Sequence, residues 1–140
     1  MILKKKSKFS LVRASKNTLD GMKVLWQQEQ SFRAEIYLSM FLIPCIFFIK
    51  VPSFVKLVLV LLLFLMLVVE ALNSAIEAVI DRISLERHPQ SKIAKDLGSA
   101  AVGMTQCMNV VAWAYAVYLR YFVVNLRNYI KYVQMAVGYV

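Results

Sequence analysis

The 140-residue chain is poor in the residues from which soluble nucleotide-binding sites are built. It has four glycines, none of them in a GxxxxGK[ST] or GxGxxG arrangement, so no glycine-rich loop is available to hold phosphates. Its two cysteines, Cys45 and Cys107, lie in apolar segments, and we interpret both as free thiols. Acidic residues number eight against seventeen basic ones. Any phosphate-binding site would therefore have to be made of side chains.

The chain is also too apolar for an ordinary soluble domain. Apolar residues make up 60% of it and its mean hydropathy is +0.61, which predicts a single membrane domain over residues 1–140. The formal net charge of +9 is concentrated before the first apolar run, from Lys4 to Lys23. Next to membrane segments, such a basic stretch favours an anchor on anionic lipid over nucleic-acid binding. The mostly polar start is not typical of a cleavable signal peptide.

Three apolar runs predict three transmembrane helices that follow an N-terminal surface helix. From Phe9 to Arg33, apolar residues recur with loosely helical spacing among basic ones, which predicts an amphipathic helix on the membrane surface. Asn17-Thr18 leaves open a second helix that starts near Leu19. The predicted fold class is an all-α membrane protein. Its segments are a basic tail and surface helix (1–33), a first span (34–51), a second span with a polar end (54–83), a cytoplasmic loop (84–95), a third span (93–119) and a C-terminal extension for which we predict no fold (120–140).

Prolines and charged residues refine this topology. Pro44 predicts a kink in the first span, and Pro89 is expected to keep the second loop out of helix. The N-terminus and the 84–95 loop hold most of the Lys and Arg residues, so the positive-inside rule places both in the cytoplasm. Aromatic residues near the end of the third span predict a belt at the far interface: Trp113, Tyr115, Tyr118 and Tyr121.

The stretch Glu70–Asp81 carries the chemistry. On a helix, Glu70, Asn73, Ser74, Glu77 and Asp81 fall within about 60° of a common direction. A carboxylate at hydrocarbon depth costs about 3 kcal/mol, so it needs a partner or a use. Carboxylates one helical turn apart, with the lysine of Lys95-Asp96 opposite, can hold a hard divalent cation and a polyphosphate.

These motifs together resemble the prokaryotic diacylglycerol kinase family, which are small membrane-embedded lipid kinases. The resemblance covers roughly Phe9 to Leu119. It is most specific at Glu70-Ala-Leu-Asn-Ser-Ala-Ile-Glu77, followed by Asp81-Arg82, His88 and Ala94-Lys95-Asp96. The resemblance implies a homotrimer in the bacterial inner (cytoplasmic) membrane, with three spans and one surface helix per chain. It also implies Mg²⁺-dependent transfer of the γ-phosphate of ATP to the hydroxyl of diacylglycerol at the cytoplasmic interface.

Residue roles follow from the resemblance alone. It implies that Glu70 is the general base on the lipid hydroxyl, and that Glu29 and Glu77 bind the Mg²⁺ that bridges the ATP phosphates. Asn73 and Lys95 would contact these phosphates. The residues implied to contact the nucleotide are Glu86, Arg87, His88 and Asp96. The residues implied to bind the lipid substrate, beside Glu70, are Ala14, Lys23, Val24, Leu25, Trp26, Ser31, Phe32, Arg33, Ala34, Glu35 and Ser99.

Two alternatives remain open at this stage. Some members of the family prefer undecaprenol, so an undecaprenol kinase is the first. The second is a small oligomeric channel or transporter whose inward carboxylates conduct cations, which would have no need of Lys95-Asp96 beside the carboxylates.

Overall fold

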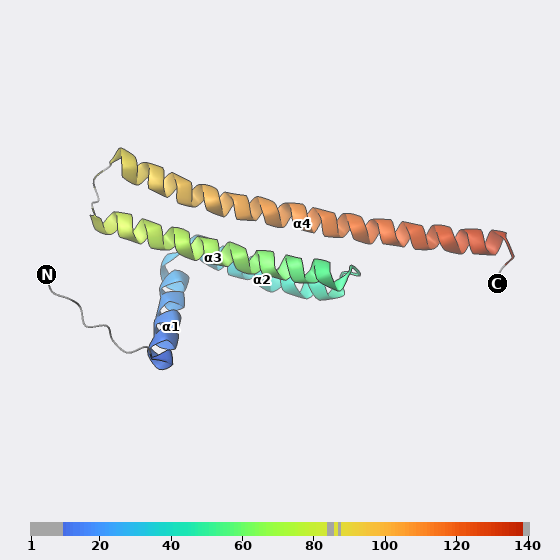
Figure 1. Ribbon diagram of the computed structural model, residues 1–140, viewed down its shortest axis with the longest axis horizontal. Helices are drawn as coiled ribbons and strands as arrows, with labels where there is room; N and C mark the ends of the chain where they lie inside the picture. The colour runs from blue at the N-terminus through green and yellow to red at the C-terminus, as the bar shows by residue number, and fades with distance from the viewer. Residues whose placement is uncertain (1–9, 84–85, 87, 139–140) are drawn as a thin grey trace.

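The computed structural model describes residues 10–83, 86 and 88–138 and is helical almost throughout (Figure 1). No strand occurs among these residues. Three of the helices are long and apolar enough to cross a membrane, which confirms the prediction of an all-α, multi-pass membrane protein. In chain order, the helices are α1 (Leu11–Gln28), α2 (Gln30–Phe48), α3 (Ser53–Ile83) and α4 (Pro89–Ala136).

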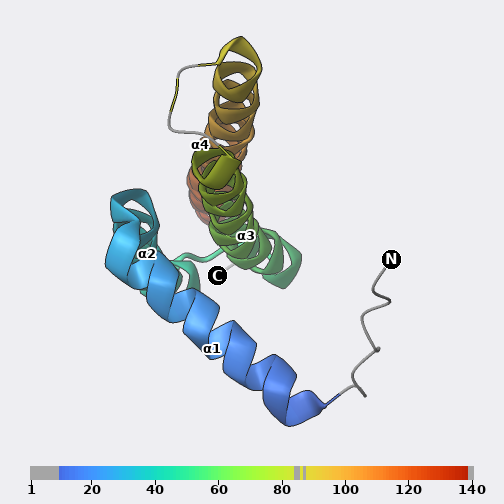
Figure 2. The same cartoon turned by 90° about the vertical axis from the view of Figure 1, so that its left-hand side faces the viewer.

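Helix α1 is one continuous helix of 18 residues that runs across the direction of the other three (Figures 1 and 2). The alternative of a helix break at Asn17-Thr18 is therefore wrong. The Thr18 hydroxyl donates to the carbonyl of Ala14 at 3.1 Å, so it satisfies its hydrogen-bonding capacity within the helix instead of capping a new one. The break comes later, at Glu29, whose backbone is extended.

The corner between α1 and α2 is held by a side chain from α2. The guanidinium of Arg33 donates to the carbonyls of Trp26 and Gln27 at 2.8 and 3.3 Å, which the end of α1 leaves without helical partners. Trp26 also packs edge-on against Tyr37, with 5.8 Å between the ring centroids. Helix α2 thus begins at Gln30, inside the segment that we assigned to the surface helix, and it ends at Phe48 rather than at residue 51.

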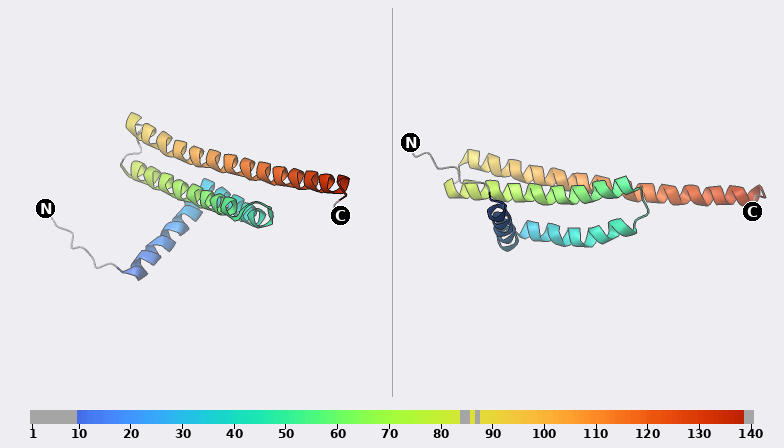
Figure 3. Two further views of the ribbon diagram at one scale, coloured as in Figure 1. Left: turned by 45° about the vertical axis from the view of Figure 1, so that its right-hand side comes forward. Right: turned by 60° about the horizontal axis from the view of Figure 1, so that its bottom comes forward.

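Helices α3 and α4 lie side by side and antiparallel (Figures 1 and 3). Helix α4 begins at Pro89, so the predicted loop 84–95 and the predicted start of the third span at 93 are corrected. Proline at the first helical position needs no hydrogen bond for its nitrogen and has a favourable φ, so it starts the helix instead of excluding it. The helix then continues for 48 residues to Ala136, through most of the 120–140 extension.

An apolar core joins α2, α3 and α4 near the connection between α2 and α3. Its fully buried members are Ile46, Leu59, Leu63, Met66 and Ala116. Toward the other end of α3, the same buried stripe continues through Glu70 and Ser74. The packing face of α3 is thus apolar in one half and polar in the other, which places the candidate site.

Candidate active site

Glu70 is the centre of the polar half. Only 4% of it is exposed, although it carries a carboxyl group. The charges that act on this carboxyl include those of Glu29 and Glu77, and the hydroxyl of Ser31 interacts with it. Glu29 and Ser31 reach α3 because the chain turns at Glu29 between α1 and α2. The fold therefore gathers carboxylates from the α1–α2 corner and from two positions of α3 that lie two helical turns apart.

A second buried carboxyl, that of Glu35, lies on α2 and interacts with Glu70. The amide of Gln106 donates to Glu35 Oε1 at 3.3 Å, whereas Glu35 Oε2 has no hydrogen-bond partner among the described residues. A cavity of about 650 Å³ opens beside this pair, between α2, α3 and α4. Its walls are mostly apolar and carry a few polar groups, which is typical of a site for a small molecule or for part of a lipid.

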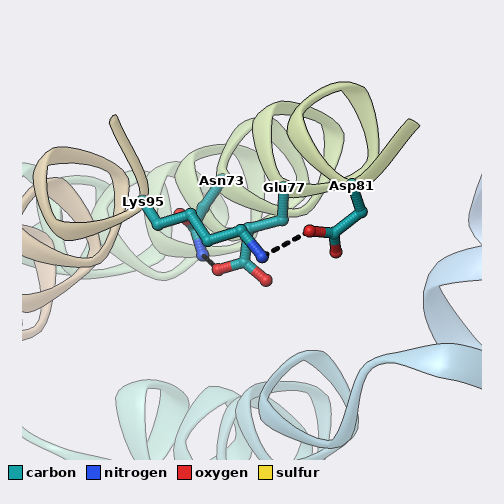
Figure 4. A network of polar contacts seen from close by, with 4 residues as sticks. All are labelled: Asn73, Glu77, Asp81 and Lys95. Carbon is teal, nitrogen blue, oxygen red and sulfur yellow. Dashed lines mark hydrogen bonds and ion pairs between the residues drawn. The ribbon is translucent and has the colours of Figure 1, made fainter. Parts of the chain in front are cut away.

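Lys95 faces the carboxylate stripe from α4 (Figure 4). Its ammonium lies 2.6 Å from Asp81 Oδ1, and the charge of Glu77 also acts on it. Asn73 completes the group, because its amide nitrogen donates to Glu77 Oε1 at 3.3 Å. Asp81, which had no predicted role, is the ion-pair partner of Lys95. A cation thus stands at the open end of the stripe, where both side chains remain partly exposed.

Asn73 also contacts the backbone of α4. A methyl group built on Gly98 would collide with Oδ1 of Asn73, so a larger residue at position 98 would require the Asn73 side chain to move. That oxygen has no hydrogen-bond partner among the described residues. Gly98 therefore serves close packing against Asn73, the residue that lies between Glu70 and Glu77.

The residues assigned to the nucleotide take up local roles in this structure. His88 caps α4, since its Nδ1 accepts a hydrogen bond from the backbone nitrogen of Gln90 at 3.2 Å. Asp96 lies 2.6 Å from the ammonium of Lys92, one turn back, and both side chains are exposed. Glu86 is exposed as well. Arg87 lies outside the described residues.

The residues assigned to the lipid fall into two groups. Ser31, Ala34 and Glu35 line the cavity beside Glu70, and Phe32 is buried on the same helix. The α1 members are exposed or half-buried, and the first turn of α1, which holds Ala14, points away from α3 (Figure 2). Ser99 is exposed on α4. A single chain therefore brings together the α2 residues and Glu70, but not Ala14. The α1 residues outside the cluster are Ala14, Lys23, Val24, Leu25 and Trp26.

Among the cavity residues that were not predicted from the sequence, three on α4 carry polar groups: Gln106, Asn109 and Trp113. Asn109 is buried and donates to the carbonyl of Leu62 at 3.1 Å. The amide and indole groups recur at helical spacing within an apolar run. This is the same signal that identified Glu70–Asp81, and it predicts one polar face on α4.

Comparison with known proteins places the chain in a family. The family model for prokaryotic diacylglycerol kinase matches residues 16–117, a range that includes Glu29, the Glu70–Asp81 stretch and Lys95. The chain belongs to the prokaryotic diacylglycerol kinase family. Proteins named diacylglycerol kinase from Pseudomonas aeruginosa, Haemophilus influenzae and Escherichia coli are 41%, 38% and 35% identical to it. The matched segments cover 74% of this chain in each case, and 85%, 87% and 84% of the relatives.

Membership in this kinase family makes the chain an enzyme and a lipid kinase. The expected family resemblance is thus confirmed. The matched range ends at Val117, so the last nineteen residues of α4 lie outside the part that the family shares.

Proposed function

We propose that this protein phosphorylates diacylglycerol to phosphatidic acid with ATP and Mg²⁺, as a homotrimer at the cytoplasmic face of the bacterial inner membrane. One observation carries the proposal. A buried carboxyl, Glu70, lies with Glu29, Glu77 and Ser31 beside a largely apolar cavity, and a cation, Lys95, faces the same stripe. A lipid alcohol requires a base beside an apolar cavity, and an anionic nucleotide requires a cation nearby. Transfer between the two substrates requires both sites side by side.

Glu70 acts as the general base in this proposal. The hydroxyl of diacylglycerol lies at the headgroup plane, and the Glu70 carboxylate accepts its proton as the hydroxyl oxygen bonds to the γ-phosphorus. The bond from that phosphorus to the oxygen bridging the β-phosphate breaks in the same transfer, and ADP leaves with the bonding electron pair. Ser31 holds the base, since its hydroxyl interacts with the Glu70 carboxyl, whereas Ser74 donates only to the main-chain carbonyl of Glu70 at 3.0 Å.

The acidic residues fit a Mg²⁺ ion that arrives with the nucleotide. Among the described residues, no group of three histidines, cysteines or carboxylates could form a complete metal cage. Mg²⁺ in kinases is commonly held by one or two carboxylates together with phosphate oxygens. Glu29 and Glu77 would hold it, and when bound it would neutralise charge on the phosphates.

Lys95 and Asn73 would orient the phosphates. Lys95 is paired with a partly exposed Asp81, and exchange of one anion for another leaves no buried charge unpaired. Glu86, Arg87 and His88, which precede α4 in the chain, and Asp96 near the start of α4 would bind the rest of the nucleotide. Nucleotide binding at these residues would draw His88 from Gln90 and Asp96 from Lys92, their partners in this structure.

The lipid side uses α2 and α1. Ser31 and Glu35 would face the headgroup, and the apolar cavity wall would receive the start of an acyl chain. In this proposal α1 lies on the membrane surface, with Lys23 at the lipid headgroups and Leu25 and Trp26 toward the acyl chains. Exposed apolar side chains on all three spans leave room for contact with lipid and with other copies, and neighbouring copies would complete the open site.

Transfer of labelled phosphate tests the proposal directly. The full chain in detergent, given labelled ATP and Mg²⁺, is expected to label diacylglycerol and to lose this activity with EDTA. Undecaprenol as the acceptor tests the alternative of the same family. Preference for undecaprenol would overturn the substrate assignment, and no transfer to either alcohol would overturn the kinase assignment.

A further inference from the structure

The part of α4 that lies beyond the family match projects past the rest of the bundle (Figures 1 and 3). On α4, Gly98 lies opposite Asn73 and Asn109 opposite Leu62 of α3, so the two helices advance residue for residue. Continued to Ser53, where α3 starts, this register reaches α4 near Tyr118. The eighteen helical residues 119–136 therefore have no counterpart on α3.

The buried stripe of α4 continues along this extension with strict heptad spacing. The residues of α4 that are buried against the bundle include Gly98, Val102, Thr105, Asn109 and Ala116, and steps of four and three residues relate them. The same alternation then leads to Leu119, Val123, Leu126, Ile130 and Val133, and to Val137 at the C-cap. Ala116 is fully buried, whereas Leu126 and Ile130 are 47% and 48% exposed. The stripe on the extension is thus a continuation of the α4 face that packs against the bundle, but there its side chains are exposed.

The residue types on this stripe are those of a coiled coil. In the heptad notation abcdefg, the stripe occupies positions a and d. Val123 and Ile130, which are β-branched, stand at a positions, and Leu119 and Leu126 stand at two of the d positions. Apolar residues at these positions form the contact seam of coiled coils. A coiled-coil stripe is complementary to itself, and copies of a chain with one membrane orientation present it in parallel. The occupant that fits is therefore a second copy of this chain.

The flanking positions agree with a parallel arrangement. Arg120 and Arg127 occupy e positions, and the g positions that precede them by five residues hold Tyr115 and Phe122. In parallel coiled coils a g residue faces the e residue of the next heptad on its neighbour, so each arginine would meet an aromatic ring. An antiparallel pair would instead oppose arginines, and no acidic residue follows Asp96 to compensate.

The direction of α4 argues against the membrane surface as the cover of this face. No proline or glycine occurs between Gly103 and Gly138, and α4 continues in line with its spanning part instead of turning aside (Figure 3). A helix of 48 residues is about 72 Å long, more than twice the hydrocarbon thickness of about 30 Å. With Lys95 near one interface, residues 119–136 stand out from the opposite interface.

We propose that residues 119–137 form a parallel coiled coil between copies of this chain on the side of the membrane opposite the active site. This inference is independent of the lipid substrate and of ATP. It assigns a role to the part of α4 beyond the family match, namely to hold copies together outside the bilayer.

Disulfide cross-linking in the full chain tests this proposal. In a Cys45→Ser, Cys107→Ser background, we compare Leu126→Cys, on the stripe, with Asn128→Cys, on the outer face two residues away. A mild oxidant should link copies at position 126 at least about tenfold faster than at position 128, because only the stripe brings Cβ atoms to disulfide distance. Val133→Cys and Met135→Cys repeat this matched comparison one heptad further along, in case either first variant does not fold.

Other occupants give different results. Equal rates at 126 and 128, or no linkage at 126 and 133, would overturn the proposal. A fluorophore attached to the thiol of the Leu126→Cys variant that is quenched by brominated lipid, without cross-linking, would assign the stripe to the bilayer. A heterologous protein linked at position 126 in place of a second copy would assign the stripe to that partner.

Discussion

The two halves of one packing stripe on α3 differ in what they bury. Leu59 and Leu63 belong to an apolar core that α2 and α4 share with α3, and their role is complete once they are packed. Glu70 and Ser74 continue the stripe, but they bury polar groups, and Glu70 interacts with other carboxylates and with Ser31 and Glu35, which line the cavity. Burial alone therefore does not distinguish core from site. The residues of the site differ from those of the core because they carry carboxyl and hydroxyl groups that can still bind or react after packing.

The polar half also contains close contacts that serve geometry. Asn73 presses against Gly98, and Lys95 joins Asp81 across the same two helices. These contacts set how far α4 stands from α3 where Glu70 is. We therefore expect mutations in the apolar half to change stability, and mutations in the polar half to separate activity from stability.

Glu70→Gln should lower turnover by about 10²–10⁴-fold, because the amide cannot accept the proton of the lipid hydroxyl. Its unfolding in detergent and its ATP binding should match those of the parent. The measurement is steady-state transfer of phosphate to diacylglycerol, beside an SDS unfolding titration. Ser74→Ala is the control, since its hydroxyl donates only to the main-chain carbonyl of Glu70, and it should keep turnover near the parental value. Near-parental turnover in Glu70→Gln would remove its role as the base.

Leu63→Ala should lower the free energy of unfolding by about 2–5 kcal/mol, because it empties space in the apolar core. Below its unfolding transition, turnover should stay near that of the parent. Leu61→Ala is the matched control on the same helix, where the side chain is 56% exposed within the chain, and should change the free energy by less than about 1 kcal/mol. Equal losses in the two variants would contradict the position of the core.

Gly98→Ala should lower the free energy of unfolding by about 1–3 kcal/mol, since the added methyl group overpacks the contact with Asn73. Because Asn73 lies between Glu70 and Glu77, turnover should fall as well, even under stabilising conditions. Gly103→Ala, on the same helix, meets nothing within 4 Å, and should raise the free energy of unfolding by up to about 1 kcal/mol through helix propensity. If both variants were equally stabilised, α3 and α4 would not approach as described.

Lys95→Met should raise the KM for ATP by about tenfold, because a charge-assisted contact to phosphate is lost. Stability should change little, since Asp81, the partner left behind, is half-exposed. Lys92→Met removes an exposed lysine one turn earlier that pairs with Asp96, and should leave the KM within about twofold. An unchanged KM in Lys95→Met would place the phosphates elsewhere.

Helix type and order could be predicted from the sequence because apolar runs and helical periodicity are local signals. The boundaries were less predictable, as Pro89 and Gln30 show. A proline is compatible with both a loop and a helix start, and the corner at Gln30 depends on Arg33 reaching back to α1. The carboxylate stripe was visible for the same local reason. Its neighbours Gln106 and Asn109 were missed, because their importance depends on which face of α4 meets the cavity.

The sequence by itself determined that the chain spans a membrane with helices and that one face of α3 combines carboxylates with an amide, because both follow from residue spacing within a single helix. Only the tertiary structure decided which of these groups are buried, that Asp81 pairs with Lys95 and that Asn73 meets Gly98. It also decided at which residue α4 extends beyond α3. Those features depend on the register between helices, which the packing of distant residues sets.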